Sequence, residues 1–204
     1  NFASGISVAD YLGDGSATFI LTDANSGETS DTVLYTWSTT GGSLALTKIA
    51  TLPASRFLQS KYDDARATAG WAPHGIRNFS MDFNHDGLMD VVVIDNLSGN
   101  GINMSEMQFL QNNGAGSFTD VTDDVLVNYS TDTQASYNPV IMDVNNDGLD
   151  DIFLSASDHI QFENHNSTRV LIQTTEGKFV ESYSDVFTDF YTQVYNMTAN
   201  SLDW

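Results

Sequence analysis

Cysteine is absent from this sequence of 204 residues, which excludes disulfide bonds and a catalytic thiol. Basic residues are rare as well: 7 Lys plus Arg stand against 27 Asp plus Glu, and the formal charge is −20. A charge of this sign repels phosphate backbones and anionic lipid surfaces. We therefore expect no nucleic acid among the partners of this protein.

Long apolar runs are also missing. No stretch of 18 or more apolar residues and no signal peptide at the start is found, so we expect no membrane insertion by this segment and place any export signal outside it. The four His show no H-E-x-x-H or other zinc spacing, and neither G-x-S-x-G nor a Gly-rich phosphate loop occurs. These absences favour a non-catalytic protein, and an enzyme stays an alternative.

A nine-residue pattern with Asp, Asn, Asp, Gly and Asp at positions 1, 3, 5, 6 and 9 occurs twice. It spans Asp82 to Asp90 and Asp143 to Asp151, and an apolar run follows each copy. Oxygen-bearing side chains around a sharp turn at Gly suit Ca²⁺, which prefers about six to eight oxygen ligands. Plain Asn/Asp/Gly turns are the alternative, but the second copy of the whole pattern favours calcium.

The EF-hand begins with the same residues but also needs a bidentate Glu at position 12 and a helix on each side. Position 12 is Val93 in one copy and Leu154 in the other. The β-branched and aromatic residues that follow each loop are typical of buried strands. We therefore predict a loop that joins two strands.

The crowded carboxylates of these loops repel one another until a cation neutralises them, so the sequence predicts calcium-dependent stability. Loops of this kind often bind calcium as weakly as extracellular modules do, which suits the millimolar calcium outside cells. We therefore expect a secreted protein with an extracellular or cell-surface location.

A third, degenerate copy of the pattern runs from Asp10 to Thr18, with Leu12 at position 3 and Thr18 at position 9. We expect this loop to keep its fold and to lack the metal. Phe118 and Phe179 each follow the first Asp of their loop by 36 residues, at the end of a Gly-containing hairpin. Each unit is therefore predicted to contain four short antiparallel strands.

The loops begin at Asp10, Asp82 and Asp143, 72 and then 61 residues apart. Four-stranded repeats of this length are typical of β-propeller blades, which must pack on neighbouring blades. We predict an all-β fold: a β-propeller segment of about three four-stranded blades with calcium loops, part of a larger propeller of about six to eight blades. The predicted units are 1–70, with the degenerate loop and a rim insertion, 71–132, 133–190, and 191–204 as the start of a further repeat or a closing strand.

The first unit is lengthened by an insertion between Pro53 and Pro73. Residues Ser55 to Arg66 are expected to form a short helix or a long loop on one rim. This insertion and the strand before it carry four of the seven basic residues, Lys48, Arg56, Lys61 and Arg66. Such insertions often bind ligands, and a plain surface loop is the alternative.

The D-x-N-x-D-G-x-x-D loop, followed by N-x-G-x-G-x-F-x-D at Asn112 to Asp120, resembles the FG-GAP/VCBS repeat family. These repeats build integrin-α-like β-propellers and occur widely in bacterial surface proteins. The resemblance covers residues 1 to about 190 and implies two structural calcium sites. The implied ligands are Asp82, Asn84, Asp86, the carbonyl of Leu88 and Asp90 in one loop, and Asp143, Asn145, Asp147, the carbonyl of Leu149 and Asp151 in the other.

The resemblance implies a calcium-stabilised extracellular module for adhesion or ligand binding. Its expected partners are a protein or glycan ligand at the cell surface and the remaining blades of the same protein. A polysaccharide lyase-like enzyme, or its scaffold, and a propeller lectin are the alternatives, because fold alone does not decide function. A rim cleft with Lys, Arg, Tyr or His near calcium favours the lyase. A repeated aromatic pocket between blades favours the lectin, and a flat face favours adhesion to a protein.

Overall fold

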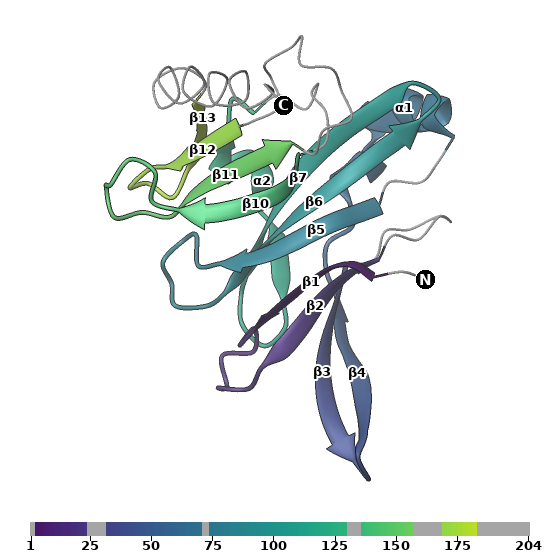
Figure 1. Cartoon of the computed structure of the whole chain (residues 1–204), viewed down its shortest axis with the longest axis vertical. Helices are drawn as coiled ribbons and strands as arrows, with labels where there is room; N and C mark the ends of the chain where they lie inside the picture. The colour runs from purple at the N-terminus through teal and green to yellow at the C-terminus, as the bar shows by residue number, and fades with distance from the viewer. Residues whose placement is uncertain (1–2, 24–31, 71–73, 130–135, 157–168, 183–204) are drawn as a thin grey trace, which may run out of the picture.

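The computed structural model of the chain (Figure 1) describes residues 3–23, 32–70, 74–129, 136–156 and 169–182. The described residues form three mostly antiparallel β-sheets, and the prediction of an all-β fold is confirmed. Among them, no helix is long and apolar enough to cross a membrane. The expected fourth unit at 191–204 lies outside the described residues, and the predicted unit boundaries stay predictions.

In each sheet, four strands follow one another in chain order. The first sheet contains β1 (Ala3–Ala9), β2 (Thr18–Asp23), β3 (Thr32–Thr40) and β4 (Ser43–Thr51). The second contains β5 (His74–Met81), β6 (Asp90–Gly99), β7 (Ile102–Asn112) and β8 (Phe118–Asp120). The third contains β10 (Ser136–Met142), β11 (Asp151–Ala156), β12 (Arg169–Gln173) and β13 (Phe179–Ser182).

The third sheet departs from the expected four strands because it has a fifth. The chain leaves the second sheet through the short helix α2 (Thr122–Val125) and continues into β9 (Leu126–Val127). This strand pairs in parallel with β13, at the outer edge of the third sheet. The edge of one sheet is thus covered by the linker from the sheet before it, which satisfies backbone groups that an open edge leaves unpaired.

The second sheet is the central layer, because both faces of β6 are buried. Val91 and Val93 contact the core shared with the first sheet, whereas Val92 and Ile94 contact the core shared with the third sheet. A strand buried on both faces reads as a continuous β-branched run instead of an alternating one. The apolar run after the loop therefore marks a strand between two neighbouring sheets.

The first strands of the three sheets lie next to one another: β1 contacts β5, and β5 contacts β10 (Figure 1). At Gly5 the backbone of β1 lies close to that of β5. A Cβ atom at this position would lie 2.6 Å from the Thr22 hydroxyl oxygen and 2.8 Å from the backbone nitrogen of Asn78. The two strands therefore meet where a side chain has no room.

The insertion of the first unit folds into short helices, and not into the long loop that was the other expectation for Ser55 to Arg66. It contains the 3₁₀ turns η1 (Arg56–Leu58) and η2 (Ser60–Tyr62) and the helix α1 (Asp63–Ala69). Phe57, Tyr62 and Ala69 are buried against Leu97 of β6. The alternative of a plain surface loop is wrong, because these apolar side chains cover one end of the second sheet.

Candidate functional site

Three loops of one conformation connect the first two strands of each sheet, at residues 10–18, 82–90 and 143–151. Position 4 has a positive φ in all three, with Gly13 at 70°, His85 at 57° and Asn146 at 61°. Position 6 is glycine with a φ of 86° at Gly15, 87° at Gly87 and 86° at Gly148. Glycine is favoured at this position because other residues reach such angles at a cost in energy.

The first Asp of each loop accepts two backbone hydrogen bonds across the turn. Asp82 accepts from the nitrogens of Asp86 at 3.1 Å and Gly87 at 2.9 Å. Asp143 accepts the equivalent bonds at 3.1 and 2.9 Å, and Asp10 does so at 3.1 and 2.7 Å. The carboxylate at position 1 therefore fixes the turn in every copy.

The degenerate loop keeps this fold with Thr18 in place of Asp at position 9. The Thr18 hydroxyl oxygen accepts a hydrogen bond from the Tyr11 nitrogen at 3.3 Å. In the second loop, Asp90 Oδ2 accepts the equivalent bond from the Phe83 nitrogen at 3.1 Å. The prediction that the loop survives there is confirmed; the loss of its metal stays a prediction.

The side chains at positions 3 and 5 of the two complete loops hydrogen-bond to each other. Asn84 Oδ1 accepts from the Asp86 nitrogen at 3.0 Å, and Asn84 Nδ2 donates to Asp86 Oδ2 at 2.8 Å. Asp86 Oδ1 accepts from the Leu88 nitrogen at 2.8 Å. The third sheet repeats these contacts at 2.9 to 3.0 Å among Asn145, Asp147 and Leu149.

The Asp at position 9 is buried at the base of the loop. Asp90 accepts hydrogen bonds from the backbone nitrogens of Phe83, on the loop, and of Asn112, at the end of β7, the latter at 2.8 Å. Burial, together with the nearby carboxylates of Asp86 and Asp82, raises the pKa of Asp90 to about 7, against the lowering effect of these two hydrogen bonds. A bound cation would favour the ionised form of such a group.

Asp151 occupies the same place in the third sheet. It accepts hydrogen bonds from the nitrogens of Val144 at 2.9 Å and Gln173 at 2.8 Å. Burial raises the pKa of this carboxyl as well. In both sheets the position 9 carboxylate therefore joins its own loop to the end of the third strand.

The residue at the end of the third strand, whose backbone nitrogen donates to the position 9 carboxylate, also contacts the loop of the preceding sheet through its side chain. Asn112 Nδ2 donates to the Tyr11 carbonyl oxygen at 3.0 Å, and Gln173 Nε2 donates to the Phe83 carbonyl oxygen at 2.7 Å. We call these two bonds the carboxamide links. They connect position 2 of one loop to the sheet that follows it.

The described residues contain no group of three or more His, Asp or Glu side chains arranged to hold a metal ion. Contacts join Asn84 to Asp86 and Asn145 to Asp147, whereas Asp90 and Asp151 bond to backbone at the loop base. Calcium and its ten implied ligands therefore stay predictions.

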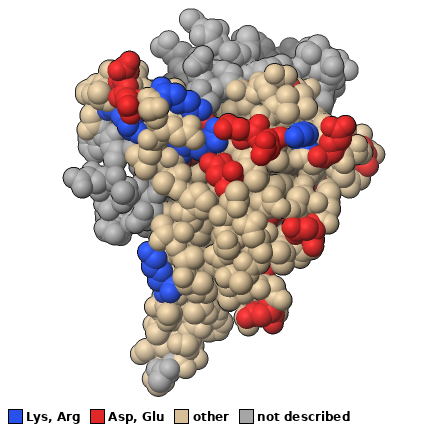
Figure 2. Space-filling model, turned by 180° about the vertical axis from the view of Figure 1, so that it is seen from behind, with Lys and Arg blue, Asp and Glu red and all other residues tan. Residues whose placement is uncertain are grey.

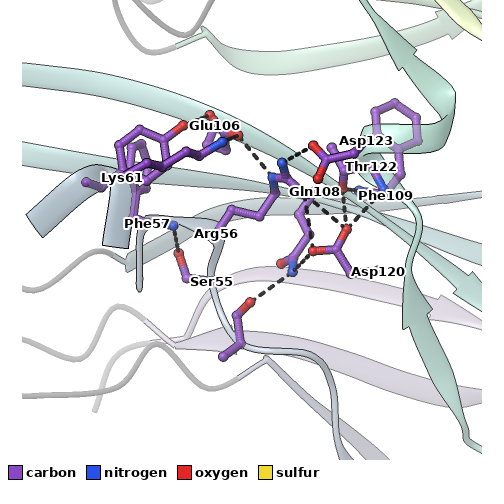
Figure 3. A network of polar contacts seen from close by, with 12 residues as sticks. Ser55, Arg56, Phe57, Lys61, Glu106, Gln108, Phe109, Asp120, Thr122 and Asp123 are labelled. Carbon is purple, nitrogen blue, oxygen red and sulfur yellow. Dashed lines mark hydrogen bonds and ion pairs between the residues drawn. The ribbon is translucent and has the colours of Figure 1, made fainter. Parts of the chain in front are cut away.

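A second candidate site lies where the insertion meets β7 and α2 (Figure 3). The Arg56 side chain is 4% exposed and pairs with Glu106 at 3.0 Å, with Asp120 at 3.5 Å and with Asp123. The Tyr62 hydroxyl donates to the other Glu106 oxygen at 2.7 Å. A buried guanidinium needs such partners, because removing its charge from water is unfavourable.

Asp95 of β6 lies opposite Glu106 of β7 and is buried beside this network. Burial raises the pKa of Asp95 to about 6; a hydrogen bond with Ser55 lowers it and the charge of Glu106 raises it. Asp95 Oδ2 has no hydrogen-bond partner among the described residues. Loss of a proton from Asp95 would therefore place an incompletely bonded charge in the interior.

The network borders a cavity of about 310 Å³. Its walls are two basic, two acidic, two tyrosine and two other side chains, namely Arg56, Lys61, Glu106, Asp123, Tyr62, Tyr129, Thr122 and Leu126. Glu106 precedes Asn112 on β7 by six residues, or roughly 20 Å of strand at about 3.4 Å per residue. The cavity thus has the Arg, Lys and Tyr expected of a lyase cleft, but it lies away from the second loop.

The sequence indicates the basic half of this site but not the acidic half. The concentration of basic residues in the insertion was the available signal. Glu106 follows Arg56 by 50 residues, and no local pattern connects them. Only the packing of the insertion on the second sheet brings them together.

Three sheets that carry the same loop in the same place, each packed on the next, define a β-repeat protein. Residues 82–154, from the second loop to β11, match the FG-GAP-like repeat family. The chain therefore contains an FG-GAP-like repeat, and the resemblance is confirmed over this stretch. The comparison with curated proteins gives no match.

Proposed function

We propose that this chain is a calcium-stabilised β-propeller module of an extracellular or cell-surface protein, which binds a ligand without catalysing a reaction. The observation that carries the proposal is the loop geometry, repeated with equal hydrogen bonds in the second and third sheets. Both loops carry oxygen-bearing side chains at positions 1, 3, 5 and 9, which is the ligand type that a hard cation prefers. The FG-GAP-like repeat over 82–154 supports the same function.

Calcium would be held by the side chains at positions 1, 3, 5 and 9 and by the carbonyl at position 7. The fit is chemical: each loop offers three carboxylates and an amide oxygen, and the position 9 carboxylate is buried near two others that raise its pKa. A bound calcium ion would neutralise this repulsion and hold the two strands together at the loop. The ligands would be Asp82, Asn84, Asp86, Leu88 and Asp90, and Asp143, Asn145, Asp147, Leu149 and Asp151.

The propeller arrangement is supported by the way in which the sheets meet. Their first strands adjoin while the later strands spread outward, as blades do around an axis (Figure 1). Val91 and Val93 of the second sheet pack on the first, and Ile152 and Leu154 of the third pack in the core shared with the second. The second and third sheets therefore use equivalent positions of β6 and β11 to cover the sheet before them.

The equivalent face of the first sheet has no covering sheet among the described residues. Ile6 and Val8, whose strand positions lie opposite Leu21 and Phe19, are 60% and 54% exposed. Further exposed apolar side chains of the first sheet are Trp37, Leu44 and Leu46. We propose that a further sheet of the same kind packs here, because apolar side chains exposed together on one sheet mark an interaction site.

The test is thermal unfolding in EDTA and across a calcium titration, for the parent protein and for Asp86→Ala and Asp147→Ala. The expected result is a midpoint that rises with calcium, because each occupied site adds about 2.7 kcal/mol to the free energy of unfolding at 100 times the Kd. Each substitution removes part of this rise. Asp14→Ala, at position 5 of the degenerate loop, is the matched control and leaves the rise unchanged. An equal midpoint in EDTA and in saturating calcium would refute the calcium sites.

A further inference from the structure

We propose that the cavity between the insertion and the second sheet binds a neutral polyhydroxylated ligand, namely a sugar. This inference deepens the ligand-binding part of the proposed function and does not depend on calcium. It rests on the walls of the cavity, the balance of their charges, and the division between fixed and accessible polar groups.

The size of the cavity suits one small ring. Its volume of about 310 Å³ lies at the lower end of the range for small-molecule sites, about 300 to 1,000 Å³. Tyr62 and Tyr129 line it together with Leu126. Aromatic and apolar walls match the C–H faces of a sugar ring, and the remaining walls offer hydrogen bonds.

The charges of the walls are balanced, because Arg56 and Lys61 stand against Glu106 and Asp123. Figure 2 shows basic and acidic side chains beside one another across the upper part of one side of the molecule. The formal charge of −20 disfavours an anionic ligand. A cationic ligand would have to compete with basic groups already paired to the same carboxylates. A hydroxyl group both donates and accepts, so a neutral polyol can bond to both kinds of wall.

The polar groups fall into a fixed and an accessible set. Arg56 and Glu106 are buried and bonded to each other, so they shape the wall. The Lys61 side chain is 51% exposed, with its Nζ 4.0 Å from Glu106 and 4.8 Å from the centre of the Tyr62 ring. The Asp123 side chain is 82% exposed and pairs with Arg56 through Oδ1, which leaves its other oxygen for a ligand. Lys61 and Asp123 can therefore bond to a ligand that rests on a preformed wall.

The experiment is a titration of the protein with neutral sugars, in which binding is detected by changes in NMR chemical shifts. The probes are glucose, galactose, mannose and N-acetylglucosamine. Galacturonate and glucosamine test the anionic and cationic alternatives. We expect at least one neutral sugar to shift the resonances of the cavity residues at about 10 mM, ten times a Kd of about 1 mM. Asp123→Asn and Lys61→Met should each weaken binding about tenfold, as for the loss of one hydrogen bond to a charged group. Both residues are exposed, so we expect the variants to fold.

Asp64→Asn on α1 and Lys48→Met on β4, both exposed, are the matched controls and should leave binding unchanged. Titrations in EDTA and in calcium separate this inference from the calcium sites, since the cavity is expected to bind equally in both. Three results would overturn the proposal: no shift with any neutral sugar, stronger binding of galacturonate or glucosamine, or binding that both cavity variants leave intact.

Discussion

Replacing Asp95 with Asn is expected to remove a pH dependence of stability. The folded pKa of Asp95 is about 6, against an ordinary value of 3.8, so the folded protein binds this proton more tightly than the unfolded chain. Stability therefore falls as pH rises between these two values. The difference corresponds to about 3 kcal/mol in all, at about 1.4 kcal/mol per pKa unit.

The assay is urea unfolding of the parent and of Asp95→Asn at about pH 5 and about pH 7.5. Roughly half of the total change in the free energy of unfolding occurs between these two pH values. Asn cannot ionise, so the stability of the variant relative to the parent should increase by about 1.5 kcal/mol between these pH values. Asp64→Asn, which changes an exposed carboxyl on α1, should run parallel to the parent. Parallel curves for Asp95→Asn would refute the argument from burial.

Two further changes test how the sheets pack. Gly5→Ala places a methyl group 2.6 Å from the Thr22 hydroxyl and 2.8 Å from the Asn78 nitrogen, so we expect a loss of about 1 to 3 kcal/mol in the free energy of unfolding. An unchanged urea midpoint would mean that β1 and β5 separate easily. Gln173→Leu leaves the Phe83 carbonyl without its 2.7 Å bond and should lower stability by about 1 to 3 kcal/mol. The exposed Gln59→Leu serves as its control, and equal unfolding curves for the two variants would contradict the role of the link.

Much of the fold follows from patterns that recur along the chain. The run Val91 to Ile94 predicts a strand because β-branched residues fill both faces, and the structure places it between two sheets. Glycines in the hairpins, such as Gly41 with a φ of 64°, indicate turns that other residues enter at a cost. The all-β fold, the loops and the four strands of the first two units could therefore be predicted.

The remainder depends on contacts between distant segments. β9 pairs with β13 across more than 50 residues, and a two-residue strand carries no periodicity of its own. Arg56 reads as a surface residue in the sequence, but it is buried because Phe57 beside it fills the end of the second sheet. The cavity follows from the same packing, so its acidic wall has no signature along the chain.

The carboxamide links couple the stability of each loop to the stability of the sheet that follows it. Stability in such an array is approximately the sum of the stability of each repeat and of its nearest-neighbour interfaces. Because Gln173 bonds both to Asp151 of its own sheet and to the Phe83 carbonyl of the second loop, opening the second loop also weakens the third sheet. Asn112 joins the first loop to the second sheet in the same way. Unfolding should therefore spread from sheet to sheet, starting at either end of the array. An ion bound in one loop would then also slow the unfolding of the neighbouring sheet.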